Sequence, residues 1–330
     1  MRRALAAAGA AVLLLSGCAA EREPPSGLYY EATGVAPDAA LLTVNGREVP
    51  ASRYFYWLAA DCGYLAQQAG GEPDWSADAG GLTLDSYVKD QALSAAVFCA
   101  VIEEQAQLCG CVLTAADLAA MDRDWAAQVR DAGGEDAYLA SLTRQGLNAA
   151  DAQLFSADYY LYERLCAMAV SGEGPLAPAD GEVDAYARRA GLYSADVLTF
   201  SSSDAAQTAL KRLESDPACQ PSAYGGCAYA RVTAAPGDGT LSPAAENALS
   251  ALEPNQWSRP VETEEGASLL RRTELDGKAA AELWFGDQLR ELAASAQVTC
   301  SEEYSRFTAA SFYSGLRTAR AEKGPSRPIS

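Results

Sequence analysis

Cysteines and carboxylates are the side chains best suited to chemistry in this chain, because its 330 residues contain no histidine. The chain therefore lacks the side chain that most often serves as a general acid or base near neutral pH. Cys109-Gly110-Cys111 places two thiols close together, as zinc sites do, but neither a histidine nor a second close cysteine pair completes a tetrahedral set. We therefore predict no metal site and no cofactor.

The first eighteen residues predict an export signal. Arg2 and Arg3 precede an apolar run, Ala4–Leu15, which is too short to span a bilayer. The next residues, Leu15-Ser16-Gly17-Cys18, are similar to a bacterial lipobox, after which cleavage leaves a lipid-modified Cys18. Two or more acyl chains hold a protein stably at a membrane surface. We expect a signal peptide over residues 1–18 and an extracytoplasmic protein anchored to the bacterial cell membrane through Cys18.

Eight further cysteines follow Cys18. An even number outside the cytoplasm permits disulfides, but the sequence does not select one pairing among the many that eight cysteines allow. Cys62, Cys99 and Cys166 lie on apolar faces of expected helices, where a free thiol packs as a small apolar residue. We predict core thiols with at most one or two bridges.

Both ends and the overall charge restrict the functions that the chain can have. Residues 19–37 are rich in small residues, Pro, Gly and Glu, which favours a flexible tether, and residues 321–330 predict a disordered tail. A formal net charge of −19 excludes nucleic acid as a partner, because the phosphate backbone would be repelled. It favours basic partners only weakly and in a salt-dependent way.

The region before residue 190 predicts a mostly helical domain. Asn45-Gly46 indicates a hairpin turn within Leu41–Pro50. Ser52 is expected to cap a helix, and a second helix is expected from about Leu84 to Cys109. Two capping-box patterns then predict the starts of two more helices, Thr114 with Asp117 and Asn148 with Asp151.

A small α+β unit is predicted after Leu192, and helices return after Asp276. Ser242-Pro243 is a good helix start, and Asp216–Thr240 is expected to be a loop. The expected strands and helices are Leu192–Phe200, Asp204–Glu214, Ser242–Leu252, Pro260–Thr263 and Ala267–Thr273.

The stretch Asn255–Thr273 resembles the closing hairpin of a parvulin-type peptidyl-prolyl isomerase (rotamase), in which a segment like G-x-x-S-x-P-V-x-T-x-x-G-Y-H-I-I ends the domain. An α+β unit inserted between helical segments is the arrangement of the SurA/PrsA-like foldases. The hairpin at Asn45-Gly46 with its aromatic-rich helix resembles the start of that family's chaperone lobe. The resemblance implies a helical SurA N-terminal-like domain over 38–190, a βαβαββ parvulin-like domain over 191–275, and C-terminal helices over 276–320 that complete the lobe.

The resemblance also implies positions for the isomerase site. Asp196 stands where the first strand of the family has a histidine, and Ser268 stands where the last strand has the second one. Cys219 falls at the family's Cys or Asp position, and the aromatic pocket positions fall on Ala245 and Ser250. Asp196, Cys219 and Ser268 are therefore the candidate catalytic residues of a degenerate site, from which we expect weak isomerase activity or none.

The resemblance implies a foldase or chaperone that binds unfolded or nascent secreted polypeptides. Five aromatic residues are the candidates for client binding. They are Tyr54, Tyr56, Trp57, Tyr159 and Tyr160. Two alternatives remain: an active prolyl isomerase, and a surface lipoprotein that acts as a scaffold or a solute-binding module. A single dominant small-ligand pocket would favour the last of these.

Overall fold

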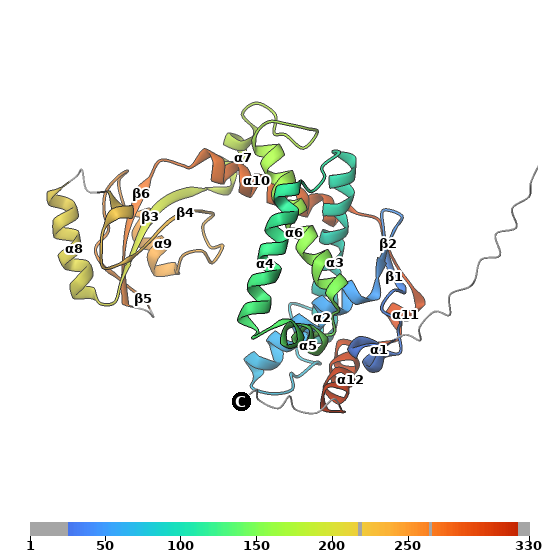
Figure 1. Cartoon of the computed structure of the whole chain (residues 1–330). Coiled ribbons are helices and arrows are strands. Elements are labelled where there is room, and N and C mark those ends of the chain that lie inside the picture. Colours follow the sequence, from blue (N-terminus) through green and yellow to red (C-terminus); the bar gives the residue numbers. More distant parts are fainter. Residues whose placement is uncertain (1–25, 217–219, 264–265, 323–330) are drawn as a thin grey trace, which may run out of the picture.

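Two bodies make up the protein, a larger helical lobe and a smaller α+β domain that projects from it (Figure 1). The computed structural model describes residues 26–216, 220–263 and 266–322. The α+β domain lies between helices α7 (Glu182–Ala190) and α10 (Gly277–Ser295) in the chain. Helix α10 packs against α3 and α6 of the lobe, and α7 packs against α10. The prediction of an α+β protein with a parvulin-like domain inserted into a mostly helical lobe is confirmed.

The lobe is built around a small sheet and long helices. Its other helices and strands are α1 (Leu28–Thr33), β1 (Ala40–Val44), β2 (Arg47–Pro50), α2 (Ala51–Ala69), α3 (Leu84–Leu108), α4 (Ala115–Asp131), α5 (Glu135–Gln145), α6 (Ala149–Val170), β7 (Val298–Cys300), α11 (Glu302–Ser305) and α12 (Ala309–Glu322). The strand order is β2-β1-β7, so a strand from the C-terminal part of the chain completes the N-terminal hairpin.

Local sequence signals set several of these elements. Asn45 and Gly46 adopt φ of 49° and 82°, the left-handed conformations that a tight hairpin turn needs. Thr114 with Asp117 and Asn148 with Asp151 form the two expected capping boxes at the starts of α4 and α6. Helix α2 begins one residue before Ser52, after Pro50, and Ser52 is buried rather than a capping residue.

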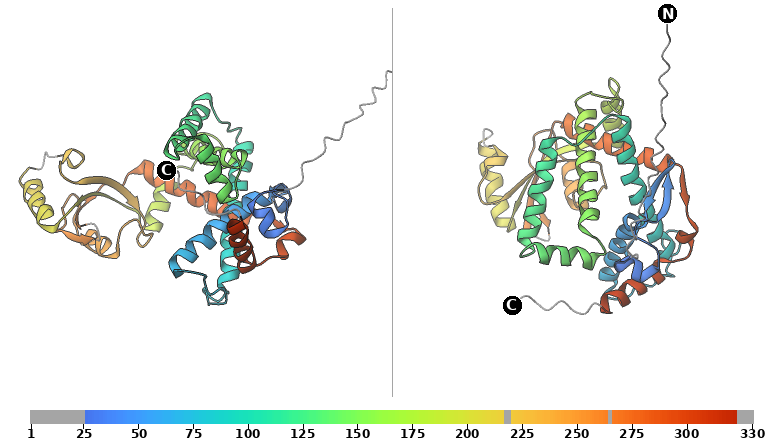
Figure 2. Two further views of the ribbon diagram at one scale, coloured as in Figure 1. Left: turned by 60° about the horizontal axis from the view of Figure 1, so that its bottom comes forward. Right: turned by 45° about the vertical axis from the view of Figure 1, so that its right-hand side comes forward.

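Packing between the two ends of the chain holds the lobe together. Helix α1 lies beside α12 (Figures 1 and 2), and an added Cβ at Gly315 would come within 2.6 Å of the Ala32 carbonyl oxygen. The Phe55 ring of α2 stacks on Phe312 of α12 with centroids 5.2 Å apart. The prediction of a flexible tether over 19–37 is therefore wrong from Leu28 onward, because Leu28 and Tyr29 are buried in this core.

The inserted domain has the predicted βαβαββ order. Its elements are β3 (Tyr193–Phe200), α8 (Ser203–Ser215), β4 (Ala228–Ala234), α9 (Pro243–Ser250), β5 (Val261–Thr263) and β6 (Gly266–Thr273), with one 3₁₀ turn at Pro221–Ala223. The four antiparallel strands lie in the order β4-β3-β6-β5. Strand β4 lies inside the predicted loop Asp216–Thr240, so that loop prediction is wrong over those seven residues.

The glycine of the closing hairpin is required by its surroundings. Gly266 has a φ of 138°, and an added Cβ would lie 2.1 Å from the carbonyl oxygen of Phe200. Strand β6 therefore reaches the end of β3 only with glycine at this position.

The described cysteines are all free thiols, of which Cys62, Cys99 and Cys111 are buried. Within those same parts of the chain, no helix is long and apolar enough to cross a membrane. No group of three or more potential metal ligands occurs there either. Cys18 and Cys219, the predicted lipidation site and a predicted catalytic residue, lie outside the described residues.

Candidate functional site

The two faces of the four-stranded sheet carry different residues. Successive side chains of a strand point to opposite faces, and β3 pairs with β6 in a regular register in which Asp196 opposes Arg271 and Thr199 opposes Ser268. Leu198 and Leu269 pack with α8 on one face. Val197 and Leu270 pack with α9 on the other. Asp196 belongs to the α8 face and Ser268 to the α9 face.

Asp196 is a fully satisfied buried carboxylate. It is 2% exposed, and its Oδ2 accepts hydrogen bonds from Arg271 Nη2 at 2.5 Å and Nε at 3.1 Å. The Tyr229 hydroxyl donates to Oδ1 at 2.9 Å. The Arg271 guanidinium in turn lies 5.1 Å from the Trp257 ring centroid. Asp196 therefore fastens β3, β4 and β6 to one another.

Ser268 has a different set of neighbours. Its hydroxyl lies 3.2 Å from the Thr199 hydroxyl, and its side chain is buried. Ala245, one of the two positions that the resemblance gives to a pocket aromatic, is buried on the same α9 face. Ser250, the other position, is exposed, and its hydroxyl donates to the Asn247 carbonyl.

Asp196 and Ser268, the two predicted catalytic residues within the described parts of the chain, are therefore not brought together. Asp196 and Ser268 lie on opposite faces of the sheet, so the expectation that both would act on one bound peptide bond is wrong. The reason is the strand register. Ser268 pairs with Thr199, which lies three residues after Asp196 on β3, and side chains an odd number of residues apart on a strand point to opposite faces.

The helical lobe contains a cavity of about 900 Å³ between α2, α3, α6 and α10. Its walls are mostly apolar and aromatic, and Tyr159, which is 59% exposed, lies at its rim. The aromatic residues that line it are Tyr56, Trp57, Phe98, Phe155, Tyr159 and Tyr162. The rings of Tyr56 and Phe155 lie 4.4 Å apart between centroids, so α2 and α6 form one continuous aromatic wall.

Three of the five predicted client-binding residues line this cavity: Tyr56, Trp57 and Tyr159. Tyr54 does not reach the surface, because it is fully buried and its ring contacts Tyr304 and Phe307 in the core. The prediction of Tyr54 as a client-binding residue is therefore wrong.

Tyr160, the last of the five, turns toward α4, where its hydroxyl donates to Asp124 Oδ2 at 2.7 Å. It follows Tyr159 directly on α6, yet it is Tyr159 that reaches the cavity.

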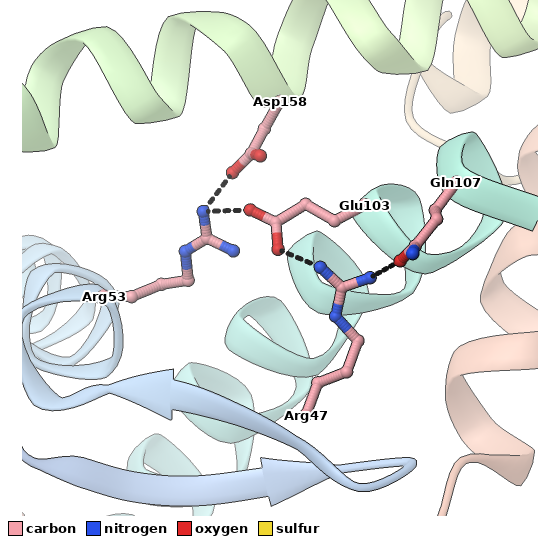
Figure 3. A network of polar contacts seen from close by, with 5 residues as sticks. All are labelled: Arg47, Arg53, Glu103, Gln107 and Asp158. Carbon is pink, nitrogen blue, oxygen red and sulfur yellow. Dashed lines mark hydrogen bonds and ion pairs between the residues drawn. The ribbon is translucent and has the colours of Figure 1, made fainter. Parts of the chain in front are cut away.

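A network of polar contacts links Asp158, which lines the cavity, to four further residues (Figure 3). Asp158 on α6 lies 2.9 Å from Arg53 Nη2, which also donates to Glu103 Oε1 at 2.9 Å. Glu103 contacts Arg47 at 3.5 Å, and Arg47 donates to Gln107 at 3.0 Å. The network connects the β1–β2 hairpin to α2, α3 and α6.

Asp158 is the poorly satisfied member of this network. It is 4% exposed, and within the described residues neither carboxylate oxygen accepts a hydrogen bond of good geometry. Arg53 lies beside it as an ion pair, and Cys99 and Glu103 are its other polar neighbours. Burial raises the pKa of Asp158 to about 7, with Arg53 opposing this effect and Glu103 adding to it. Burial likewise raises the pKa of the neighbouring Cys99 thiol to about 12.

Sequence reasoning missed Asp158, Arg53 and Glu103. Asp158 is preceded and followed by helical residues of mixed polarity, and only its position among apolar residues at helical spacing, between Leu154, Phe155 and Leu161, hinted at burial. The charge partners come from helices about fifty residues or more away in sequence, so no local pattern identifies them.

The inserted domain matches a known family model. Residues 180–283 match the PPIC-type PPIASE domain, which confirms the parvulin-type resemblance of this part of the chain. No curated protein matches the chain.

Several solved structures are similar to the chain over most of its length. PrsA from Bacillus subtilis is 15% identical, with 78% of this chain and 94% of that chain covered and a TM-score of 0.32. The foldase protein PrsA from Lactococcus lactis is 14% identical, with 86% and 93% covered and a TM-score of 0.28. A structure described with two SurA-like chaperones of Campylobacter jejuni, PEB4 and Cj1289, is 11% identical, with 80% and 99% covered and a TM-score of 0.23.

Proposed function

We propose that this protein, in which a PPIC-type domain is inserted into a helical lobe, is an extracytoplasmic foldase or chaperone that binds unfolded polypeptides through the lobe. The prolyl isomerase activity of the inserted domain is weak or absent. Cys18, lipidated, anchors the protein to the membrane.

The observation that carries the proposal is the aromatic cavity of the lobe. Side chains from four helices leave about 900 Å³ open beside an exposed tyrosine. Unfolded chains expose apolar and aromatic side chains that folded proteins hide, and a concave apolar surface binds such side chains with little sequence preference.

The geometry of the inserted domain supports weak or absent catalysis. Isomerisation requires a dry pocket in which polar groups converge on one amide bond. The carboxylate of Asp196 already accepts hydrogen bonds from Arg271 and Tyr229, and Ser268 lies on the other face of the sheet. The small side chain of Ala245 packs against the sheet where the family's pocket aromatic would stand.

Suppression of aggregation tests the proposal. The chain from residue 19 onward is mixed with a reduced, unfolded secreted protein, and light scattering is followed with time. We expect scattering to fall in proportion to added protein, and Tyr159→Ala to suppress aggregation several-fold less well at equal concentration. A control, Tyr160→Ala, changes the neighbouring residue on the α4 side of the same helix and should retain full suppression. Absence of suppression at stoichiometric excess would contradict the chaperone function.

A proline-peptide isomerisation assay on the same preparation tests the second candidate function, an active isomerase, which the family match favours. We expect a rate equal to the uncatalysed rate. A rate above background that Cys219→Ala abolishes would establish the isomerase and leave the chaperone result unaffected.

The size of the cavity also suits a small solute, the remaining alternative. The exposed rim at Tyr159 favours a polypeptide, because an extended chain can enter with one side chain and leave across the rim. Displacement of a bound unfolded client by short peptides, but not by sugars or free amino acids, distinguishes the two.

A further inference from the structure

The floor of the lobe cavity carries polar groups that lack partners. Buried polar groups in folded proteins are nearly always hydrogen-bonded, and a buried group without a partner costs about 1–3 kcal/mol. Among the described residues, both oxygens of Asp158 and the indole Nε1 of Trp57 are buried without a hydrogen bond. Both residues line the cavity. Neighbouring atoms cover these polar atoms, so a ligand in the cavity can satisfy them only where the lining side chains move aside to admit its polar group.

The guanidinium groups around this floor compensate the carboxylates unequally. Arg53 is the nearest positive charge, but its Nη2 is shared between Asp158 and Glu103 and donates a hydrogen bond only to Glu103. Arg290, which lines the cavity from α10, contacts Asp287 at 2.5 Å. Arg47 lies farther out and contacts Glu103 and Gln107. Of these carboxylates, Asp158 is thus the one whose negative charge is least balanced by a neighbouring arginine.

The walls suit a long side chain with a charged end. Tyr56, Trp57 and Phe155 form an aromatic cluster in which Trp57 and Phe155 meet edge to face at 6.2 Å. The aliphatic stem of a lysine or arginine packs well on such rings while its head group remains polar. A cation beside aromatic faces gains about 0.5–2 kcal/mol in addition.

We propose that this cavity binds a lysine or arginine side chain of the unfolded polypeptide, with the aliphatic stem against the aromatic wall and the charged group at Asp158. The inference rests on the proposed client-binding function and gives it a specificity: clients are held best at basic residues flanked by apolar ones. An apolar side chain would fill the walls but leave Asp158 without a partner. A carboxylate would be repelled by Asp158 and Glu103.

The protonation of Asp158 gives this subsite a pH dependence. A cation binds the ionised carboxylate, and burial raises the pKa of Asp158 to about 7. Below that pH the proton must first leave, so the affinity for a cationic side chain falls up to tenfold for each pH unit. The affinity of an uncharged side chain of the same length does not follow this dependence. The charged and titratable groups around the carboxylate are Arg53, Cys99, Glu103 and Arg290.

The experiment changes the peptide first, so that it uses the intact protein. Short acetylated and amidated peptides carry Leu and Phe around a central lysine, norleucine or glutamate, and their binding is measured by calorimetry at about pH 8 and about pH 6. We expect the lysine peptide to bind at least about tenfold tighter than the norleucine peptide at the higher pH, and the ratio to shrink at the lower pH. Equal binding of the two peptides at the higher pH overturns the proposal.

Two protein variants then locate the effect. Asp158→Asn keeps the shape of the side chain and should bring the lysine-to-norleucine ratio close to one. Asp124→Asn removes an exposed carboxylate on α4 and should leave the ratio unchanged, which separates the subsite from general attraction to an acidic surface. A lysine preference that survives in Asp158→Asn overturns the proposal. If aggregation of unfolded clients is suppressed but the ratio is one, the subsite is wrong and the chaperone function stands.

Discussion

Two buried aspartates, one in each body of the molecule, differ in how completely the fold satisfies them. Asp196 in the inserted domain accepts three hydrogen bonds, two from Arg271 and one from Tyr229. Asp158 in the lobe accepts none from the described residues and has a single ion pair with an arginine that it shares. Both are less than 5% exposed, so burial alone does not distinguish them.

On the proposal made above, the difference separates a structural carboxylate from one that binds a ligand. A buried charge that is paired and hydrogen-bonded holds neighbouring strands together, and nothing remains for a ligand to bind. A buried carboxylate beside a cavity with unused acceptor sites is a candidate for ligand binding. The family resemblance pointed to the first aspartate, but the physical chemistry points to the second.

The largest expected effect comes from removing the satisfied carboxylate. Asp196→Ala leaves the partly buried Arg271 and the Tyr229 hydroxyl without their acceptor, and loss of one partner of such a pair costs about 3–5 kcal/mol. We expect the amides of β3 and β6 to exchange hydrogen correspondingly faster, as measured by mass spectrometry.

Arg231 is the matched control for this change. It stands opposite Asp196 on β4 but is exposed. Arg231→Ala should alter the same exchange rates by less than about 0.5 kcal/mol. Client binding by the lobe should persist in both variants. Loss of client binding in Asp196→Ala with the lobe still folded would mean that the inserted domain takes part in holding.

The next effect is a pH-dependent difference at Asp158. The pKa of this carboxyl is raised to about 7 in the folded protein, above its value in the unfolded chain. The stability that comes from the proton is therefore complete below the unfolded pKa of about 4 and is lost as the pH rises from there to about 7. Relative to Asp158→Asn, the native protein should lose about 1.4 kcal/mol of unfolding free energy per pH unit, or about 2 kcal/mol between pH 5.5 and 7.

Urea unfolding of both proteins at a series of pH values measures this difference. Asp124→Asn, at an exposed site on α4, is the control. If the unfolding free energies of the native protein and Asp158→Asn vary with pH in the same way, the pKa of Asp158 is not raised and the prediction is wrong.

The helices and strands that the sequence predicted correctly are those whose ends depend on interactions between residues close together in the chain. Capping boxes at Thr114 and Asn148 satisfy the first amides of a helix within three residues, so they are readable in the chain itself. Strand β4 was missed because it lies at the edge of the sheet and is mostly exposed, which removes the alternation of apolar residues that marks a strand. Helix α1 was also missed, because it is only six residues long and packs against α12, which lies far along the chain.

The candidate site was harder to predict for a related reason. A linear motif gives the position of Asp196 and Ser268 on their strands but not the register that places them on opposite faces. The floor at Asp158 arises where α2, α3 and α6 meet, and each helix contributes one charged residue to it. Such a site becomes visible only when the helices are placed in space.

A smaller effect is expected at the hydroxyl pair on the α9 face. Ser268→Ala leaves the Thr199 hydroxyl without its partner and should cost about 1 kcal/mol. Ser268→Ala combined with Thr199→Val replaces both partners by apolar groups and should recover most of that loss. Restoring the family's residue with Ser268→His should leave isomerisation at the uncatalysed rate, because no second acid or base converges on it from β3. An isomerase gain of tenfold or more would show that one residue accounts for the missing activity.

The smallest expected effect separates two adjacent tyrosines of α6 and returns to the lobe. The Tyr160 hydroxyl donates to the exposed Asp124, and a hydrogen bond at such a site contributes little because water replaces it. Tyr160→Phe should therefore change the unfolding free energy by less than about 0.5 kcal/mol and leave the affinity for the lysine peptide unaltered. Tyr159→Phe, at the rim of the cavity, retains the ring and should also bind normally, whereas Tyr159→Ala removes part of the wall and should bind several-fold more weakly with equally small change in stability. Equal weakening by alanine at both positions would mean that the polypeptide lies along the outer surface of α6 rather than in the cavity that Asp158 closes.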